Sequence, residues 1–147
     1  YIGGSLAWPV PSHNGKQYIS SYYGWRTLYG RQNFHTGIDI ARGPQASIAR
    51  ATIVPANSGT VVYIQANSNV GYGNYVIVDH GGGIKTLYAH CDKILVSMNQ
   101  MVTRNETPIA TVGKTGNSTG PQLHFELRVN NTEKEDPYPY LSGAREL

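Results

Sequence analysis

Several residue types are scarce in this sequence, and each shortage excludes a class of protein. A single cysteine, Cys91, excludes an internal disulfide framework. Charged residues are 14% of the chain, against about a quarter in an average soluble domain, and the net charge is only +3. Without a run of Lys and Arg there is no stripe for nucleic acid, and no apolar run is long enough to span a membrane.

Glycine and tyrosine, in contrast, are abundant, with 17 and 11 residues among 147. This length fits one domain with a real core. Short β-branched and aromatic segments alternate with turn residues, and no ten-residue helical pattern separates them. We therefore predict a mostly β fold: a single domain with an antiparallel sheet. Residues 1–17 form an irregular lead-in and residues 18–147 the domain. Because the chain begins at Tyr1, we expect a processed or trimmed piece of a longer protein.

The predicted strands follow one another at short spacing. They cover residues 19–26, 59–64, 74–80, 84–90, 108–112 and 122–129. Residues 27–33 read as a polar loop, 41–46 as a turn, 92–96 as a turn or short helix, and 113–121 as a loop. In the last strand strict alternation puts Gln122, His124, Glu126 and Arg128 on one side and apolar residues on the other.

The most informative stretch is Phe34-His35-Thr36-Gly37-Ile38-Asp39-Ile40. Imidazole nitrogen and carboxylate oxygen are both good zinc ligands, and a catalytic zinc needs three protein ligands. Gly37 and the β-branched isoleucines favour a loop that enters a strand over a helix. Taken alone, the motif favours a buried histidine beside a solvated aspartate over a metal site. His90, at the end of a predicted strand, and His124 supply the further candidates.

Taken together, these segments resemble the lysostaphin/LytM family of zinc endopeptidases, which cut the peptide part of bacterial peptidoglycan. The likeness covers roughly residues 18–141. The matching segments are His35–Ile40, Gly71-Tyr72-Gly73-Asn74, Leu87-Tyr88-Ala89-His90 and Gly116–Glu126. The family fold, related to the duplicated hybrid motif, has its site in a groove on an antiparallel sheet, in agreement with the strand pattern.

The resemblance implies a role for each candidate residue. His35, Asp39 and His124 would hold Zn²⁺, and His90 would accept a proton or steady the intermediate. Tyr29 falls where some members place an oxyanion-contacting tyrosine. Glu126 would either orient a metal ligand or face solvent, and we expect it to face solvent. The partner implied is a peptidoglycan peptide outside the cytoplasm, with secretion or attachment to the bacterial envelope, no nucleic acid and no membrane span.

One position departs from the family pattern. The family reads His-x-His where this chain reads Gln122-Leu123-His124, so the second catalytic histidine is replaced. Glutamine cannot take up a proton near neutral pH, although its amide can donate a hydrogen bond. Losing one proton-transfer partner typically costs about 10²- to 10⁴-fold in rate.

Three hypotheses follow from this substitution: a slowed zinc endopeptidase, a zinc-binding scaffold or regulator for wall peptide or a protein partner, and a degenerate domain without metal. Cys91 stands beside His90, but adjacent strand residues point to opposite faces. We therefore expect Cys91 in the core and not in a Cys–His pair.

Overall fold

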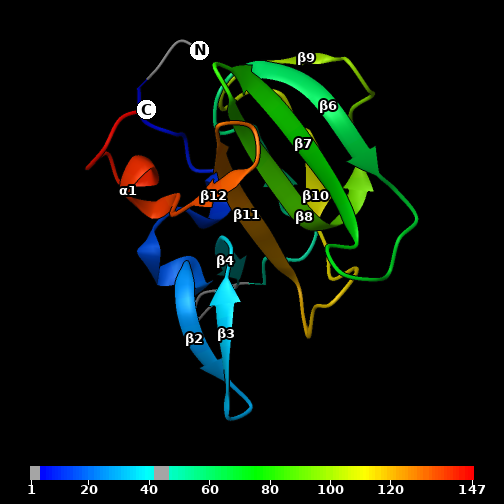
Figure 1. Cartoon of the computed structure of the whole chain (residues 1–147). Coiled ribbons are helices and arrows are strands. Elements are labelled where there is room, and N and C mark those ends of the chain that lie inside the picture. Colours follow the sequence, from blue (N-terminus) through cyan, green and yellow to red (C-terminus); the bar gives the residue numbers. More distant parts are fainter. Residues whose placement is uncertain (1–3, 42–46) are drawn as a thin grey trace.

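The computed structural model describes residues 4–41 and 47–147, and its architecture is mostly β, as predicted (Figure 1). The turn expected at 41–46 lies, apart from Ala41, outside the described residues. The elements are η1 (Pro11–His13), η2 (Lys16–Tyr18), β1 (Ile19–Ser21), β2 (Gly24–Leu28), β3 (Arg31–His35), β4 (Ile38–Ala41), β5 (Thr52–Ile53), β6 (Gly59–Gln65), β7 (Asn74–Gly81), β8 (Ile84–Ile94), β9 (Met101–Val102), β10 (Ala110–Val112), β11 (Gln122–Val129), β12 (Glu133–Glu135) and α1 (Tyr138–Leu141).

One large sheet dominates the fold. Its strands lie in the order β1-β4-β11-β8-β7-β6-β9, while β12 pairs with β11, and β10 pairs with both β8 and β5. Neighbouring strands run antiparallel, which confirms the sheet type predicted from the short connections. In the centre of this sheet β11 lies between β4 and β8, so it brings residues from distant parts of the chain side by side.

The core forms on the sheet and extends into the N-terminal segment. β7 alternates between buried and half-buried residues, as a strand with one core face should. β8 and β11 instead have runs of buried residues on both faces. Leu6, Trp8 and Val10, from the segment predicted as an irregular lead-in, are buried in the same core. The boundary between residues 17 and 18 remains a prediction, although this segment packs with the rest.

A hairpin replaces the loop predicted over residues 27–33. β2 and β3 pair through Gly24 to His35 and project from the body of the molecule at the lower edge of Figure 1. Tyr29 and Gly30 form the turn with φ of 52° and 74°. Positive φ at both central residues is the type I′ pattern, which suits the twist of a hairpin. The sequence prediction missed it because Tyr-Gly lacks the usual Asn or Asp at the first position.

β8 also runs further than predicted. The strand continues through Asp92 to Ile94, where a turn or short helix was expected, because β10 pairs with it at Cys91 and Ile94. The register shifts between these two pairs and again beside β7, so the strand is irregular around His90. Among the described residues no helix combines the length and apolarity needed to cross a membrane.

Candidate metal centre

Two neighbouring strands and a tight turn position the candidate ligands. Asp39 of β4 and His124 of β11 are directly opposite in the strand register, and His35 ends β3 just before the turn into β4. That turn lies against β11 so closely that a Cβ on Gly37 would overlap the carbonyl oxygen of Phe125. Glycine is therefore required here for close approach of the backbones, and this approach brings His35 over the sheet.

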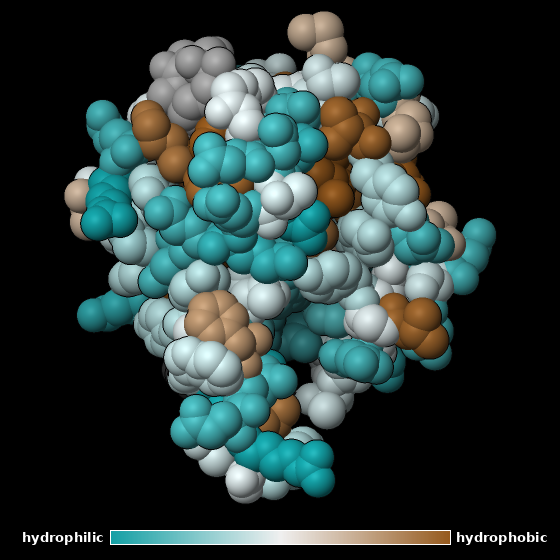
Figure 2. Space-filling view, in the orientation of Figure 1, coloured by the Kyte–Doolittle hydropathy of each residue, from teal (hydrophilic) through white to brown (hydrophobic). Residues whose placement is uncertain are grey.

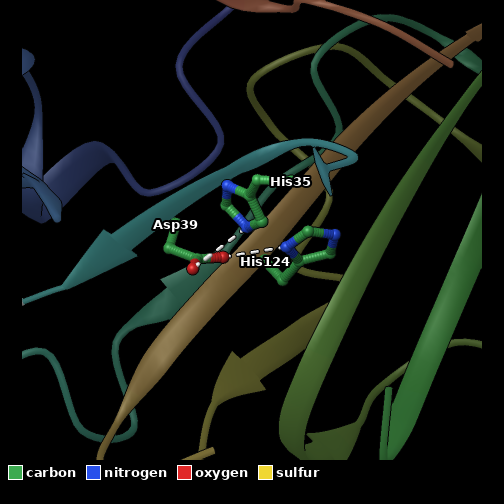
Figure 3. Close-up of side chains that lie close together, drawn as sticks. All are labelled: His35, Asp39 and His124. Atoms are coloured by element: carbon green, nitrogen blue, oxygen red, sulfur yellow. Dashed lines mark hydrogen bonds and ion pairs between the residues drawn. The ribbon is translucent and has the colours of Figure 1, made fainter. Parts of the chain in front are cut away.

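The three side chains converge on one point (Figure 3). One potential ligand atom from each of His35, Asp39 and His124 lies within 4.8 Å of the others. His35 Nε2 is 3.2 Å from Asp39 Oδ2, and His124 Nδ1 is 2.8 Å from Asp39 Oδ1. All three residues are buried, with exposed fractions of 5%, 8% and 5%. The sequence-predicted ligand set is thus brought together in a single cluster.

Hydrogen bonds fix which ring nitrogen of each histidine faces that point. His35 Nδ1 lies 2.9 Å from the carbonyl oxygen of Tyr22, and because a carbonyl only accepts, Nδ1 carries the proton. His124 Nε2 lies 2.9 Å from Glu126 Oε2 and donates to it. The other nitrogen of each ring faces Asp39, and it can bind a metal ion once it carries no proton. Metal-binding histidines in proteins are held by outer partners of this kind.

Glu126 is buried, so the expectation that it faces solvent is wrong. Its carboxylate, with no exposed surface, accepts hydrogen bonds from His124, from Thr36 Oγ1 at 2.7 Å and from the Tyr72 hydroxyl. Arg128 donates to the second oxygen from Nε and Nη2 at 3.2 and 3.0 Å. Alternation placed Glu126 correctly on the polar side of β11, but that side is covered here. The carboxylate orients His124.

Tyr72 and Thr36 are further members of the cluster, and the sequence analysis assigned neither of them to it. The ring of Tyr72 stacks on that of His124, with centroids 5.6 Å apart and planes at 25°. The signal was present, since Gly71-Tyr72-Gly73-Asn74 is one of the segments that carry the family resemblance, and Thr36 lies next to His35. Neither residue belongs to the usual metal-ligating types, so composition alone did not select them.

The electrostatics of the cluster favour charged carboxylates. Burial raises the pKa of Asp39, but hydrogen bonds from His124 and His35 outweigh it and hold that pKa well below its ordinary value. Burial likewise opposes charge on His124, yet its bonds to Asp39 and Glu126 raise its pKa to about 9. In Glu126 the bonds from His124 and Tyr72 overcome burial and lower the pKa to about 2. Two histidines held by a carboxylate fit a divalent cation such as zinc, which binds in exchange for protons.

The cluster opens into a cavity of about 890 Å³. The hairpin forms one wall, and the loops at residues 71–72 and 116–119 form the other. Figure 2 shows the surface hollowed between the projecting hairpin and the body of the molecule. Besides His35, Asp39 and His124, the polar or aromatic lining residues are Ser20, Ser21, Arg26, Tyr29, Asn33, Phe34, Thr36, Tyr72, His90, Asn117, Ser118, Thr119 and Gln122.

His90 enters this cavity from a strained backbone position. Its φ is +62°, unusual for a residue other than glycine and found more often at functional sites. The backbone N–H donates to the Tyr72 carbonyl at 2.8 Å, and Nδ1 donates to the Thr115 carbonyl at 2.7 Å. Nε2 is thereby left as the acceptor. Burial lowers the pKa of His90, which favours the neutral ring.

Gln122 and Tyr29 both line the same cavity, at different depths. Gln122 is half-buried, and its Nε2 donates to Ser118 Oγ at 3.0 Å. Tyr29 is 91% exposed at the hairpin turn, so it lies at the rim. The ring centroid of His90 is 6.1 Å from that of His124, so His90 lies close to the candidate ligands. The catalytic roles of these three residues remain predictions.

Comparison with known proteins agrees with this fold. The model of peptidase family M23 matches residues 33–137, and the chain belongs to this family. A relative in Neisseria meningitidis, the DD-carboxypeptidase/endopeptidase Mpg, is 40% identical over 114 residues, 76% of this chain and 24% of that protein. The peptidoglycan DD-endopeptidase ShyB of Vibrio cholerae is 38% identical over 69% of the chain and 22% of its own length. The chain thus spans about a quarter of these relatives.

Two solved catalytic domains match over almost their whole length. The catalytic domain of the prophage-encoded M23 protein EnpA from Enterococcus faecalis, in a mutant form, superposes with a TM-score of 0.72 and 32% identity, over 87% of this chain and 95% of that one. The catalytic domain of lysostaphin from Staphylococcus simulans gives 0.73 and 27%, over 90% and 95%. The expected lysostaphin-like fold is confirmed.

Proposed function

We propose that this chain is a zinc-dependent endopeptidase domain that acts on peptide cross-links or stem peptides of bacterial peptidoglycan. The observation that supports it most directly is the arrangement of His35, Asp39 and His124. Two imidazole nitrogens and a carboxylate face one point at the floor of an open cavity. Three protein ligands with solvent access are the pattern of a catalytic zinc site and not of a structural one.

Different residues of the cavity take different roles in the proposed reaction. When bound, zinc supplies Lewis acidity toward a peptide carbonyl and lowers the pKa of a coordinated water. His90 accepts a proton at Nε2, since Nδ1 is held by the Thr115 carbonyl. Glu126 holds His124 in the tautomer that binds metal. Gln122 offers an amide N–H to a developing oxyanion but moves no proton, so turnover is slow.

A scaffold function is the second candidate, and Gln122 is the observation that favours it. Its amide already donates to Ser118 Oγ, and no imidazole stands at its position. On this alternative the domain binds zinc together with wall peptide or a partner protein and cleaves nothing. Among the relatives, one 34% identical protein of Caulobacter vibrioides is the cell division protein DipM, and one of Haemophilus influenzae is the outer membrane antigenic lipoprotein B. These names support an envelope location for either candidate.

The test compares the zinc-loaded chain with its Gln122→His variant on purified peptidoglycan. We expect slow release of soluble fragments and new amines, stopped by a chelator and restored by zinc, and roughly 10²- to 10⁴-fold faster release by Gln122→His. Gln122→Ala is the matched control for the amide donor. Release that persists after chelation contradicts the zinc mechanism. Binding to sacculi without cleavage by either version supports the scaffold.

A further inference from the structure

The cavity has an asymmetric charge distribution. Within the described part of the chain, Arg26 is the only Lys or Arg that lines it and Asp39 the only acid. Arg26 comes from the hairpin wall, whereas the opposite wall carries the neutral side chains of Asn117, Ser118, Thr119 and Gln122. A fixed positive charge on one wall, beside the metal centre, predicts where an anionic group of the substrate would lie.

Arg26 is held in place within the hairpin. Its Nη1 donates to Ser21 Oγ at 2.7 Å, and Nε donates to Oδ1 of Asn33, its partner across the two strands, at 3.4 Å. The side chain is 32% exposed. No described residue accepts a hydrogen bond from Nη2. A guanidinium is a planar fork of five N–H donors that matches a carboxylate in bidentate geometry, so this one retains donor capacity.

The nearby Asp39 does not satisfy that capacity. Arg26 Nη1 is 3.9 Å from Asp39 Oδ2, too far for a hydrogen bond. Asp39 is already engaged by His124 at 2.8 Å and by His35 at 3.2 Å. The carboxylate therefore belongs to the metal cluster, and the arginine stands next to that cluster with its charge only partly compensated.

We propose that Arg26 forms a carboxylate subsite on the hairpin wall, through which the domain selects peptides that carry a free carboxylate beside the scissile bond. The inference rests on the proposed function, because it assigns a substrate feature to the same cavity. A D-alanyl–diaminopimelate cross-link has such a carboxylate on the carbon next to the scissile amide nitrogen. A glycyl–glycine bridge has none. Of these two, Arg26 selects the diaminopimelate type.

Binding of two matched peptides tests the subsite independently of catalysis. The zinc-loaded chain is titrated calorimetrically with a cross-linked D-alanyl–diaminopimelate peptide dimer, once with its free carboxylate and once with that group as a carboxamide. We expect the carboxylate form to bind roughly 10- to 100-fold more tightly, the range of a charge-assisted hydrogen-bond pair. The ratio falls as ionic strength rises, because the guanidinium is partly exposed.

Variants on the hairpin assign the preference to one residue. Arg26→Gln is expected to reduce the ratio to within about twofold, and Arg26→Lys, which keeps the charge without the fork, retains part of it. Arg31→Gln removes the same charge from the neighbouring strand outside the cavity lining and leaves the ratio unchanged. Equal or absent binding of the two peptides by the unmodified chain, or a preference that survives Arg26→Gln, overturns the proposal.

Metal content and recovered peptide complete the test. Arg26→Gln should still hold one zinc per chain. Loss of that zinc would mean that the arginine acts on Asp39 and not on substrate, which also overturns the subsite. Peptide recovered after each titration is checked for cleavage. If neither this chain nor Gln122→His cleaves any peptide, the endopeptidase proposal fails, while the carboxylate preference is still measured on its own.

Discussion

The candidate ligand cluster and the side of the cavity that carries His90 and Gln122 are built differently. His35, Asp39 and His124 come from the end of β3 and from paired strands of the sheet, and all are buried. The remaining nitrogen of each histidine is held by Tyr22 or Glu126. On the other side of the cavity, loop residues hold His90 and Gln122 in place.

Loop contacts hold the residues of that second side. His90 is held by the carbonyls of Tyr72 and Thr115, and half-buried Gln122 by Ser118. Among the described residues, no hydrogen bond joins the Gln122 side chain to the three candidate ligands. A substitution at Gln122 should therefore leave their arrangement intact. Gln122 and His124 are only two residues apart on β11, but their side chains have different hydrogen-bond partners.

The largest effect should come from removing a ligand. Asp39→Ala takes away the carboxylate that both histidines face, and it leaves His124 without its partner at 2.8 Å. We expect no stoichiometric zinc and no cleavage, measured by elemental analysis of the dialysed protein and by fragment release. Gln122→Ala, from the loop-held side, should retain one zinc per chain. Zinc retained at full stoichiometry by Asp39→Ala would refute this ligand assignment.

Glu126→Gln, which also alters the ligand cluster, should weaken zinc binding less than Asp39→Ala does. A carboxamide must turn its NH₂ either toward the donors Thr36, Tyr72 and His124 or toward Arg128, so one set of donors loses its acceptor. We expect zinc affinity to fall roughly 10- to 100-fold, as for other outer partners of metal-binding histidines. Competition with a chelator of known affinity measures it. Glu133→Gln on exposed β12 is the control, and equal affinities in the two variants would contradict the role of Glu126.

The smallest effect on zinc binding is expected from a substitution in the loop that holds His90. Gly116 has φ of +76°, and an added Cβ would overlap the backbones of Gly71 and Gly73. Gly116→Ala should therefore shift the loop whose Thr115 carbonyl holds His90, costing about 1–2 kcal/mol of stability for the left-handed backbone alone. Gly120→Ala meets nothing within 4 Å and should be neutral. Thermal unfolding and zinc titration check both, and a loss of zinc from Gly116→Ala would break the distinction between the two sides.

Much of the fold and of the ligand cluster could be predicted from the sequence. Alternation over residues 122–129 gave the strand and the correct side for His124, and Gly37 with its isoleucine neighbours indicated a turn into a strand. Alternation does not say what covers a polar side, however. Glu126 was therefore expected in solvent, although Tyr72, Thr36 and Arg128 enclose it.

The hairpin wall was missed for a related reason. The Tyr29-Gly30 turn adopts positive φ at both residues without an Asn-Gly or Asp-Gly signal. Arg26 was assigned to a predicted strand, but nothing in its local sequence indicates that it lines the cavity beside Asp39. Contacts between segments far apart in the chain determine both the hairpin and the position of Arg26. A single sequence indicates such contacts only through resemblance to a family.

The burial of Cys91 has a practical consequence. Its thiol has no exposed surface, donates to the Tyr88 carbonyl at 3.3 Å, and has a pKa raised to about 12 by burial. A thiolate is the reactive form of cysteine, so Cys91 should react slowly with alkylating reagents and oxidants while the domain is folded. As the only cysteine in the chain, placed next to His90 and paired with β10, it is a natural label for local opening. The rate of its modification reports how often the strand beneath the cavity separates from its neighbours.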